Sequence, residues 1–86
     1  YKPGTVTTGL DVWTDYQTVT EGGAEISFRY YGTAEHYSML VTLSDKYDYK
    51  VTLDGVEIKP NMRNKGCMEL TFDNSIAQGI VKIEKA

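Results

Sequence analysis

Residues 49–59 read Tyr49-Lys50-Val51-Thr52-Leu53-Asp54-Gly55-Val56-Glu57-Ile58-Lys59. Apolar and polar residues alternate on both sides of Asp54-Gly55, and Asp-Gly between two such runs is the strongest short-range signal for a β-hairpin. Because side chains alternate across a pleated strand, Tyr49, Val51 and Leu53 share one face, which we expect to be buried. The residues between them fall on the other face and are expected to meet solvent. This stretch predicts an antiparallel β fold.

Similar alternating runs occur along the rest of the chain, with Gly, Asn and Asp between them. A spacing of roughly 8–12 residues between such runs is typical of β-sandwiches and barrels. We expect a first strand at 10–13, which continues after a kink over 16–19, and then strands at 25–31, 37–43, 49–53, 56–59, 68–72 and 80–84. Residues 61–66 are expected to form a loop, and residues 74–79 a turn anchored by Ile76 or, as the weaker option, a short helix.

These runs add up to about seven or eight short strands with little or no helix. The prediction is an all-β fold, an antiparallel β-sandwich of immunoglobulin-like or jelly-roll-like type. The length of 86 residues fits a single domain with one core. We expect residues 1–9 to be a linker-like N-terminal segment or a first edge strand, and residues 10–86 to be the sandwich.

The N-terminal residues indicate a piece of a longer protein. The chain begins with Tyr1 instead of methionine, and Lys2-Pro3-Gly4 is typical of a linker. No apolar run approaches the roughly 20 residues that span a bilayer, so we expect no membrane insertion. The nine Lys and Arg residues are scattered and the formal net charge is −3, which argues against a nucleic-acid partner.

Metal, cofactor and thiol chemistry find no support in the sequence. Cys67 is the only cysteine, which excludes an internal disulfide and any multi-cysteine metal site. It comes at the start of an alternating run, where a half-buried small apolar residue is expected. His36 is the only histidine, and no motif pairs it with Cys67. We therefore predict no metal site and no cofactor.

Paired carboxylates are the remaining candidates for catalysis. Glycosidic hydrolysis needs two carboxyl groups across a cleft, one of them with its pKa raised by burial. The residues around the candidate carboxylates are Thr, Gly, Lys and Tyr, which favours positions in solvated turns and at strand edges. Residues 45–48 could offer oxygens to a calcium ion, but a solvated turn is favoured there too. We predict no enzymatic activity from the three candidate pairs, which are Asp11 with Asp15, Glu21 with Glu25, and Asp45 with Asp48.

The aromatic residues are the unusual element, since the chain has seven tyrosines, one tryptophan and two phenylalanines. Tyr30 and Tyr49 share the phase of buried residues, so we expect their rings inside and their hydroxyls at the rim. Flat amphipathic rings on a sheet or loop suit the apolar faces of sugars, and they suit a protein partner equally well. Strand propensity and cross-strand packing also explain them. Tyr37 is among the less easily buried ones, and the candidate ligand-binding residues are Trp13, Tyr16, Tyr31 and Tyr47.

Three consecutive patterns carry a resemblance over roughly residues 49–84. They are Tyr-x-Val-x-Leu-Asp-Gly at 49–55, Gly-x-Met-x-Leu-x-Phe-Asp at 66–73 and Val-Lys-Ile-Glu at 81–84. In this respect the chain is similar to small β-sandwich modules appended to secreted carbohydrate-active enzymes. The resemblance carries over no functional residues.

The expected function is a non-catalytic accessory module of a larger extracellular or cell-envelope protein. Its expected partners are neighbouring domains and a polysaccharide or another protein, with carbohydrate binding as the activity that exposed aromatics favour. The alternative is a structural spacer or protein-interaction domain with no small ligand. A sugar-binding role predicts that Trp13, Tyr16, Tyr31 and Tyr47 share one exposed patch, whereas a spacer predicts them scattered or covered.

Overall fold

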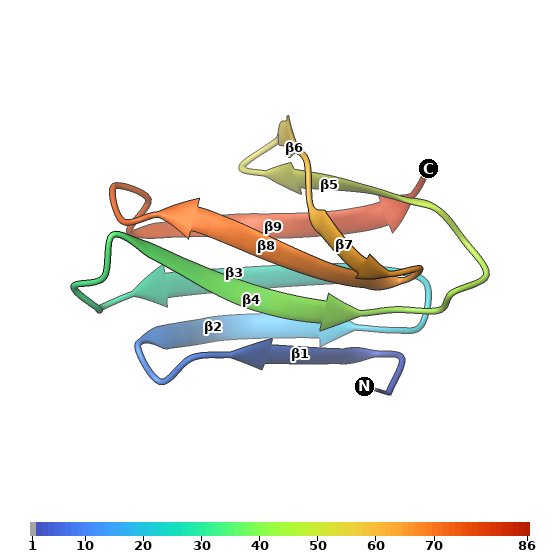
Figure 1. The fold of residues 1–86 in the computed structure, drawn as a ribbon, viewed down its shortest axis with the longest axis horizontal. Coiled ribbons are helices and arrows are strands. Elements are labelled where there is room, and N and C mark those ends of the chain that lie inside the picture. The colour runs from blue at the N-terminus through green and yellow to red at the C-terminus, as the bar shows by residue number, and fades with distance from the viewer. Residues whose placement is uncertain (1) are drawn as a thin grey trace.

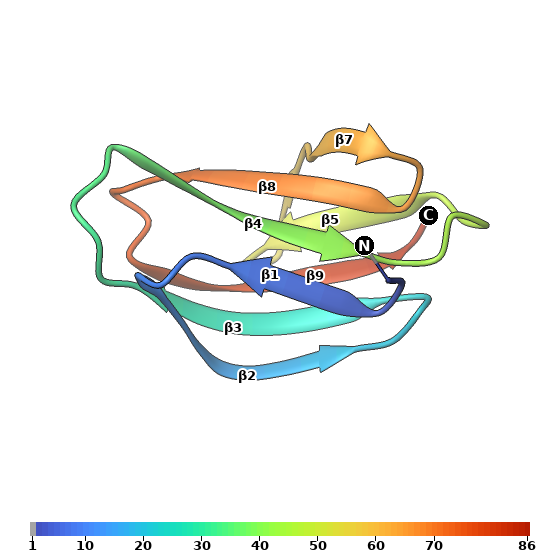
Figure 2. The same ribbon diagram turned by 60° about the horizontal axis from the view of Figure 1, so that its bottom comes forward.

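The computed structural model describes residues 2–86, which form two antiparallel sheets packed face to face as a β-sandwich (Figure 1). One sheet has the order β1-β4-β8-β7 and the other has the order β2-β3-β9-β5-β6. The two sheets form two layers, seen edge-on in Figure 2. The nine strands are β1 Thr5–Thr8, β2 Val12–Val19, β3 Ala24–Tyr30, β4 His36–Thr42, β5 Tyr49–Leu53, β6 Val56–Ile58, β7 Asn61–Asn64, β8 Cys67–Asp73 and β9 Gln78–Lys85.

The predicted hairpin is confirmed as β5–β6. Val51 pairs with Ile58 and Leu53 with Val56 across a two-residue turn. Asp54 and Gly55 have φ angles of 50° and 85°. Two consecutive positive φ angles define a type I′ turn, whose twist matches that of the flanking strands and which Asp-Gly adopts at low cost.

The core lies between the two sheets and is made by the inward phase of the central strands. On β3 the alternation predicted from sequence is confirmed, because Ile26 and Phe28 are fully buried while Arg29 faces solvent. The strand expected at 37–43 is found as β4, which is central in its sheet because it lies between β1 and β8. The buried cluster consists of Ala24, Ile26, Phe28, Tyr30, Tyr37, Met39, Val41, Leu43, Val51, Met68, Leu70, Phe72, Val81 and Ile83.

Tyr37 is buried, which corrects the expectation that it resists burial. Its ring stacks on Tyr30 with centroids 3.8 Å apart, and it tilts against Phe72 at 5.5 Å. Its hydroxyl donates to the carbonyl of Ile76, which lies on the 74–79 turn and packs partly against the core. Burial, with a smaller contribution from Tyr30, raises the pKa of Tyr37 to about 12. The aromatic core of the sandwich therefore includes a tyrosine that sequence phase alone did not place there.

Two boundaries differ from the sequence prediction. Residues 61–66 are not a plain loop, because β7 pairs with β8 through a short turn at Lys65-Gly66. All four side chains of β7 are exposed, so no alternation of apolar residues marks the strand. Leu10 belongs to the turn before β2 and not to a strand, and its side chain is fully exposed.

The N-terminal segment contains an edge strand. Within the predicted linker-like range 1–9, Tyr1 lies outside the described residues, and β1 pairs with β4 in register Thr5 to Thr42. In residues 2–86 no helix is long and apolar enough to cross a membrane. The finer topology, immunoglobulin-like or jelly-roll-like, stays a prediction.

Candidate functional site

A β-bulge puts Trp13 and Tyr16 on the same face of β2. Residues three positions apart normally point to opposite faces of a strand. Here the register with β3 shifts, so that Trp13 pairs with Arg29 and Tyr16 with Ser27. The extra residue, Asp15, restores the outward phase for Tyr16. Both rings therefore lie on the outer face of the five-stranded sheet, Trp13 61% exposed and Tyr16 44%.

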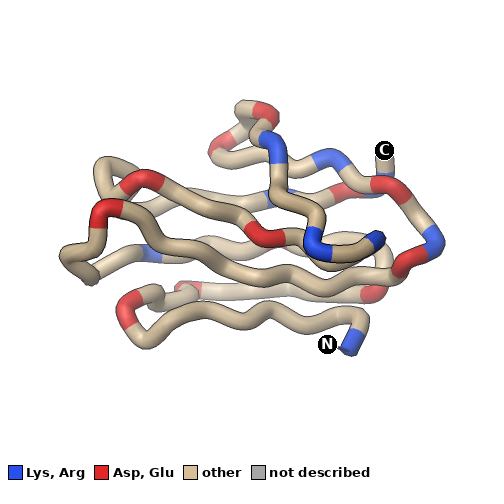
Figure 3. The backbone as a smooth tube through the Cα atoms, in the orientation of Figure 1, with Lys and Arg blue, Asp and Glu red and all other residues tan. Residues whose placement is uncertain are grey.

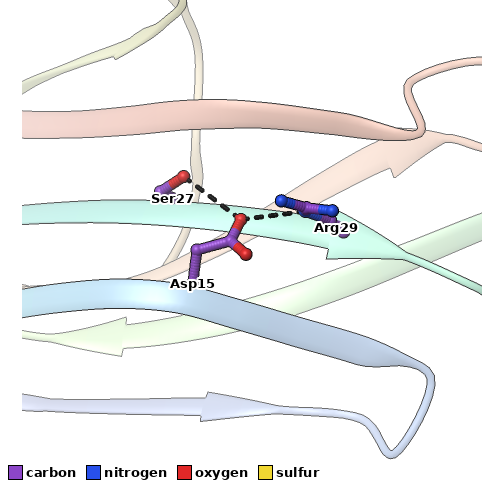
Figure 4. A network of polar contacts seen from close by, with 3 residues as sticks. All are labelled: Asp15, Ser27 and Arg29. Carbon is purple, nitrogen blue, oxygen red and sulfur yellow. Dashed lines mark hydrogen bonds and ion pairs between the residues drawn. The ribbon is translucent and has the colours of Figure 1, made fainter.

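The bulged residue makes a polar network across to β3. Asp15 Oδ2 accepts a hydrogen bond from Arg29 Nε at 3.1 Å and from Ser27 Oγ at 3.5 Å (Figure 4). The ion pair is partly solvated, so its contribution to folding is small. Its main effect is geometric, because it holds a carboxylate and a guanidinium side by side on the sheet surface.

Tyr31 extends this face beyond the end of β3. Its backbone N–H donates to the carbonyl of Asp11 at 2.8 Å, which continues the ladder between β2 and β3. Tyr31 lies two residues past Arg29, the partner of Trp13, and diagonal neighbours of this kind are about 7–8 Å apart. With 68% of its surface exposed, Tyr31 stands next to Trp13 at one end of the face.

Two pKa shifts reflect contacts on this surface. The hydrogen bond and charge of Asp15 raise the pKa of Arg29, and Tyr31 adds a smaller contribution in the same direction. The Tyr16 hydroxyl donates to Glu25 Oε2 at 2.8 Å, and this bond to a carboxylate raises the pKa of Tyr16. Each polar group beside the exposed rings is thus held by a neighbour.

We call this surface the β2–β3 platform. Its members are Trp13, Asp15, Tyr16, Ser27, Arg29 and Tyr31. It combines exposed aromatic rings at both ends with a fixed set of hydrogen-bond donors and acceptors between them. Such a surface suits a flat ligand that has both apolar faces and hydroxyl groups.

A shallow hollow of about 360 Å³ adjoins the platform on the side of β9. Gly79 lies in its lining, and a Cβ there would come to 2.7 Å from Leu53 Cδ1, the end of a flexible side chain that would have to shift. The hollow gives the polar middle of the platform room for a ligand group. Its lining consists of Asp15, Ser27, Phe28, Arg29, Asp54, Gln78, Gly79 and Ile80.

Tyr47 does not join the other three candidates. It lies in the β4–β5 connection, at the opposite end of the sandwich from the start of β2 (Figure 1). Lys85 Nζ stands 3.9 Å from the centroid of its ring, and Tyr49 packs against it edge-on. The larger hollow of about 880 Å³ that Tyr47 lines also includes Glu21, on the turn after β2. The structure therefore brings together Trp13, Tyr16 and Tyr31 and places Tyr47 apart.

The candidate carboxylates lie in solvated positions. Asp15 is engaged with Arg29 and Glu25 with Tyr16, and the other four are exposed. In residues 2–86 no group of three His, Cys, Asp or Glu residues is arranged to hold a metal ion. Cys67 is buried, and it pairs with Thr42 at one end of the β4–β8 ladder while His36 lies at the other.

Comparison with family models, curated proteins and solved structures found no match. The site is therefore defined by its own geometry. Sequence reasoning missed the joint role of Asp15, Ser27 and Arg29. The sequence held one signal for the bulge. Trp13 and Tyr16 are both aromatic residues expected to be exposed, and residues three positions apart in a strand share a face only if a residue between them is bulged.

Proposed function

We propose that the β2–β3 platform binds a carbohydrate chain. The observation that supports this most is the bulge at Asp15, which aligns Trp13 and Tyr16 on one outer face, next to Tyr31. Three large rings exposed on one sheet face are not needed for the core, which is complete on the inner face. Their exposure costs solvation free energy that binding recovers.

The chemistry of binding follows from the platform's parts. Trp13 and Tyr31 stack against the C–H face of a sugar ring, and Tyr16 contacts a second ring further along the strand. Between them, Asp15 accepts hydrogen bonds from hydroxyl groups and Arg29 donates to hydroxyl or ring oxygens. No covalent step is involved, so the proposed role is that of a non-catalytic accessory module. Polysaccharides occur mainly outside cells, which fits an extracellular or envelope protein.

Affinity electrophoresis in gels that contain arabinoxylan, mixed-linkage β-glucan or galactomannan tests this proposal. The unmodified protein should be retarded by at least one polymer, and Trp13→Ala should abolish that retardation. Tyr47→Ala is the matched control, because it removes an exposed aromatic residue from the opposite end and should leave retardation unchanged. Equal retardation of the Trp13→Ala variant and the unmodified protein would refute the platform as the site.

One observation favours a second candidate, a contact with a protein partner. Leu10 is fully exposed in the turn that leads into β2, close in sequence to Trp13. Exposed aromatic rings are typical of protein interfaces, and an exposed leucine nearby in the chain adds apolar surface there but contributes little to sugar stacking. Leu10→Ser separates the two functions. Carbohydrate retardation should survive this change, whereas binding to a protein partner should be lost.

A further inference from the structure

The cations that strands β3, β5 and β9 carry on the outer face of the five-stranded sheet each lie beside a carboxylate. Arg29 is bonded to Asp15 at 3.1 Å. Lys82 Nζ lies 3.4 Å from Glu84 Oε1, and Lys50 stands directly opposite Glu84 in the register of β5 and β9. None of these three cations is thus placed to attract an anionic ligand by itself.

Carboxylates outnumber cations on the same face. The strands under the aromatic rings are poor in positive charge, because β2 has no Lys or Arg and β3 has only Arg29. Figure 3 shows most of the positive charge elsewhere, towards β5–β7 and the β4–β5 connection. The acidic residues of the face are Asp15, Glu25, Asp54, Glu57 and Glu84, against the basic residues Arg29, Lys50, Lys82 and, just past β6, Lys59.

We infer that the platform takes a neutral glycan and rejects acidic ones, and that Asp15 is the residue that sets this specificity. The inference rests on the proposed function. Arg29 is the only cation among the platform residues, and a guanidinium is the group best suited to grip the carboxylate of a uronic acid. Asp15 already neutralises Arg29 through Nε, so an incoming carboxylate would meet the negative charge of Asp15 beside the guanidinium.

A neutral sugar faces no such conflict. Both hydrogen bonds that Asp15 receives from β3 end on Oδ2, and Oδ1 is free to accept from a hydroxyl. Arg29 uses Nε for Asp15 and retains its terminal amino groups as donors. Of two adjacent hydroxyl groups on a sugar ring, one can donate to the Asp15 carboxylate while the other accepts from the Arg29 guanidinium. The ion pair thus presents a neutral hydrogen-bonding surface that discriminates by charge.

The test measures binding of the unmodified protein and of Asp15→Asn to two groups of polymers at low and at high salt. Arabinoxylan, mixed-linkage β-glucan and galactomannan are the neutral probes, and polygalacturonate and alginate are the acidic ones. Asp15→Asn frees Arg29, so it should gain affinity for an acidic polymer by about fivefold at low salt, a gain that high salt removes. The unmodified protein should bind a neutral probe and neither acidic one.

Two control variants distinguish a local effect from a change in net charge. Glu84→Gln removes the same charge from the same face but leaves Lys82 directly opposite Glu25 in the register of β3 and β9, and should gain no acidic binding. Asp15→Asn combined with Arg29→Gln should lose the gain again. These side chains are at least partly exposed, so the variants should fold, which thermal melting verifies.

The outcomes separate this inference from the proposed function. Acidic and neutral polymers bound equally well by the unmodified protein would overturn the charge selectivity and leave carbohydrate binding intact. Neutral binding without any gain in Asp15→Asn, or an equal gain in Glu84→Gln, would overturn the role of Asp15. No binding of any polymer by the unmodified protein would refute the proposed function itself.

Discussion

Tyr30 and Tyr31 are neighbours in the chain, but one is buried and the other is exposed. Tyr30 is the last residue of β3, is 9% exposed, and stacks on Tyr37 in the core. Its hydroxyl accepts a hydrogen bond from the Ala34 N–H at 3.0 Å. Tyr31 is 68% exposed, and Trp13 lies diagonally across from it in the register of β2 and β3.

The difference between these two tyrosines shows how one strand supplies both a core and a surface. Strand alternation sends one ring between the sheets and the next one to the outer face. Burial of the first ring contributes to the stability of the fold, whereas the second contributes to binding in the proposed function. Variants of buried residues should therefore change stability, and variants of exposed rings should change affinity.

Tyr30→Ala should have the largest effect on stability. Loss of a buried aromatic ring leaves a cavity and should lower the free energy of unfolding by about 3–5 kcal/mol. Urea denaturation followed by circular dichroism measures this. A loss below about 1 kcal/mol would mean that the stack on Tyr37 contributes little to the core.

Gly55→Val should have the next largest effect, because a β-branched residue resists the φ of 85° at this position. The expected loss in the free energy of unfolding is about 1–3 kcal/mol. A Cβ at this position meets nothing within 4 Å, so the cost comes from the backbone alone. Gly55→Asn, which tolerates this conformation better, should lose less in the same denaturation experiment.

Tyr37→Phe should cost about 1 kcal/mol at neutral pH through loss of the hydrogen bond to Ile76. It should also change the alkaline stability. The pKa of Tyr37 is about 12 in the folded protein and about 10 in the unfolded chain, so the fold favours the neutral phenol. The resulting stability is complete below pH 10 and disappears as the pH rises from about 10 to about 12.

Denaturation at several pH values between 8 and 12 checks the titration of Tyr37. The unmodified protein should lose stability over the upper part of this range, and Tyr37→Phe should lose less. The Tyr37→Phe variant should still lose some stability at alkaline pH through Tyr49, because burial raises the pKa of Tyr49 as well. Parallel curves for the two proteins would contradict the assignment of the titration to Tyr37.

Tyr31→Ala should have the smallest effect on stability, within about 0.5 kcal/mol, because its ring is exposed. Its effect on carbohydrate affinity should be larger, a loss of about two- to tenfold from the missing stacking contact. Denaturation and affinity electrophoresis on the same preparation measure the two quantities. A variant with lower stability and unchanged retardation would mean that Tyr31 contributes to folding and not to carbohydrate binding.

The sequence was sufficient to predict the features that depend on local chemistry. The Asp54-Gly55 turn and the alternation in β3 follow from turn preference and from burial on one face, and both are confirmed. The all-β sandwich follows from the spacing of such runs. The outward phase of Tyr31 follows from the same alternation, because it comes directly after the buried Tyr30.

Features that depend on pairing between distant residues were not predictable. β7 has four exposed side chains, and only its hydrogen bonds to β8 make it a strand. Tyr37 is buried because Tyr30 and Phe72 come to it from other strands. The bulge at Asp15 exists only relative to β3, so the grouping of Trp13 with Tyr16 became visible only in the structure.

The fluorescence of Trp13 tests the central claim most directly, since it is the only tryptophan and lies on the platform. The titrants are soluble xylo-, cello- and manno-oligosaccharides. With its ring 61% exposed, the free protein should emit at long wavelength, and at least one neutral oligosaccharide should shift the emission to the blue in a saturable way. Tyr31→Ala should weaken that response and Tyr47→Ala should not. An emission spectrum that none of these sugars changes would contradict carbohydrate binding at the β2–β3 platform.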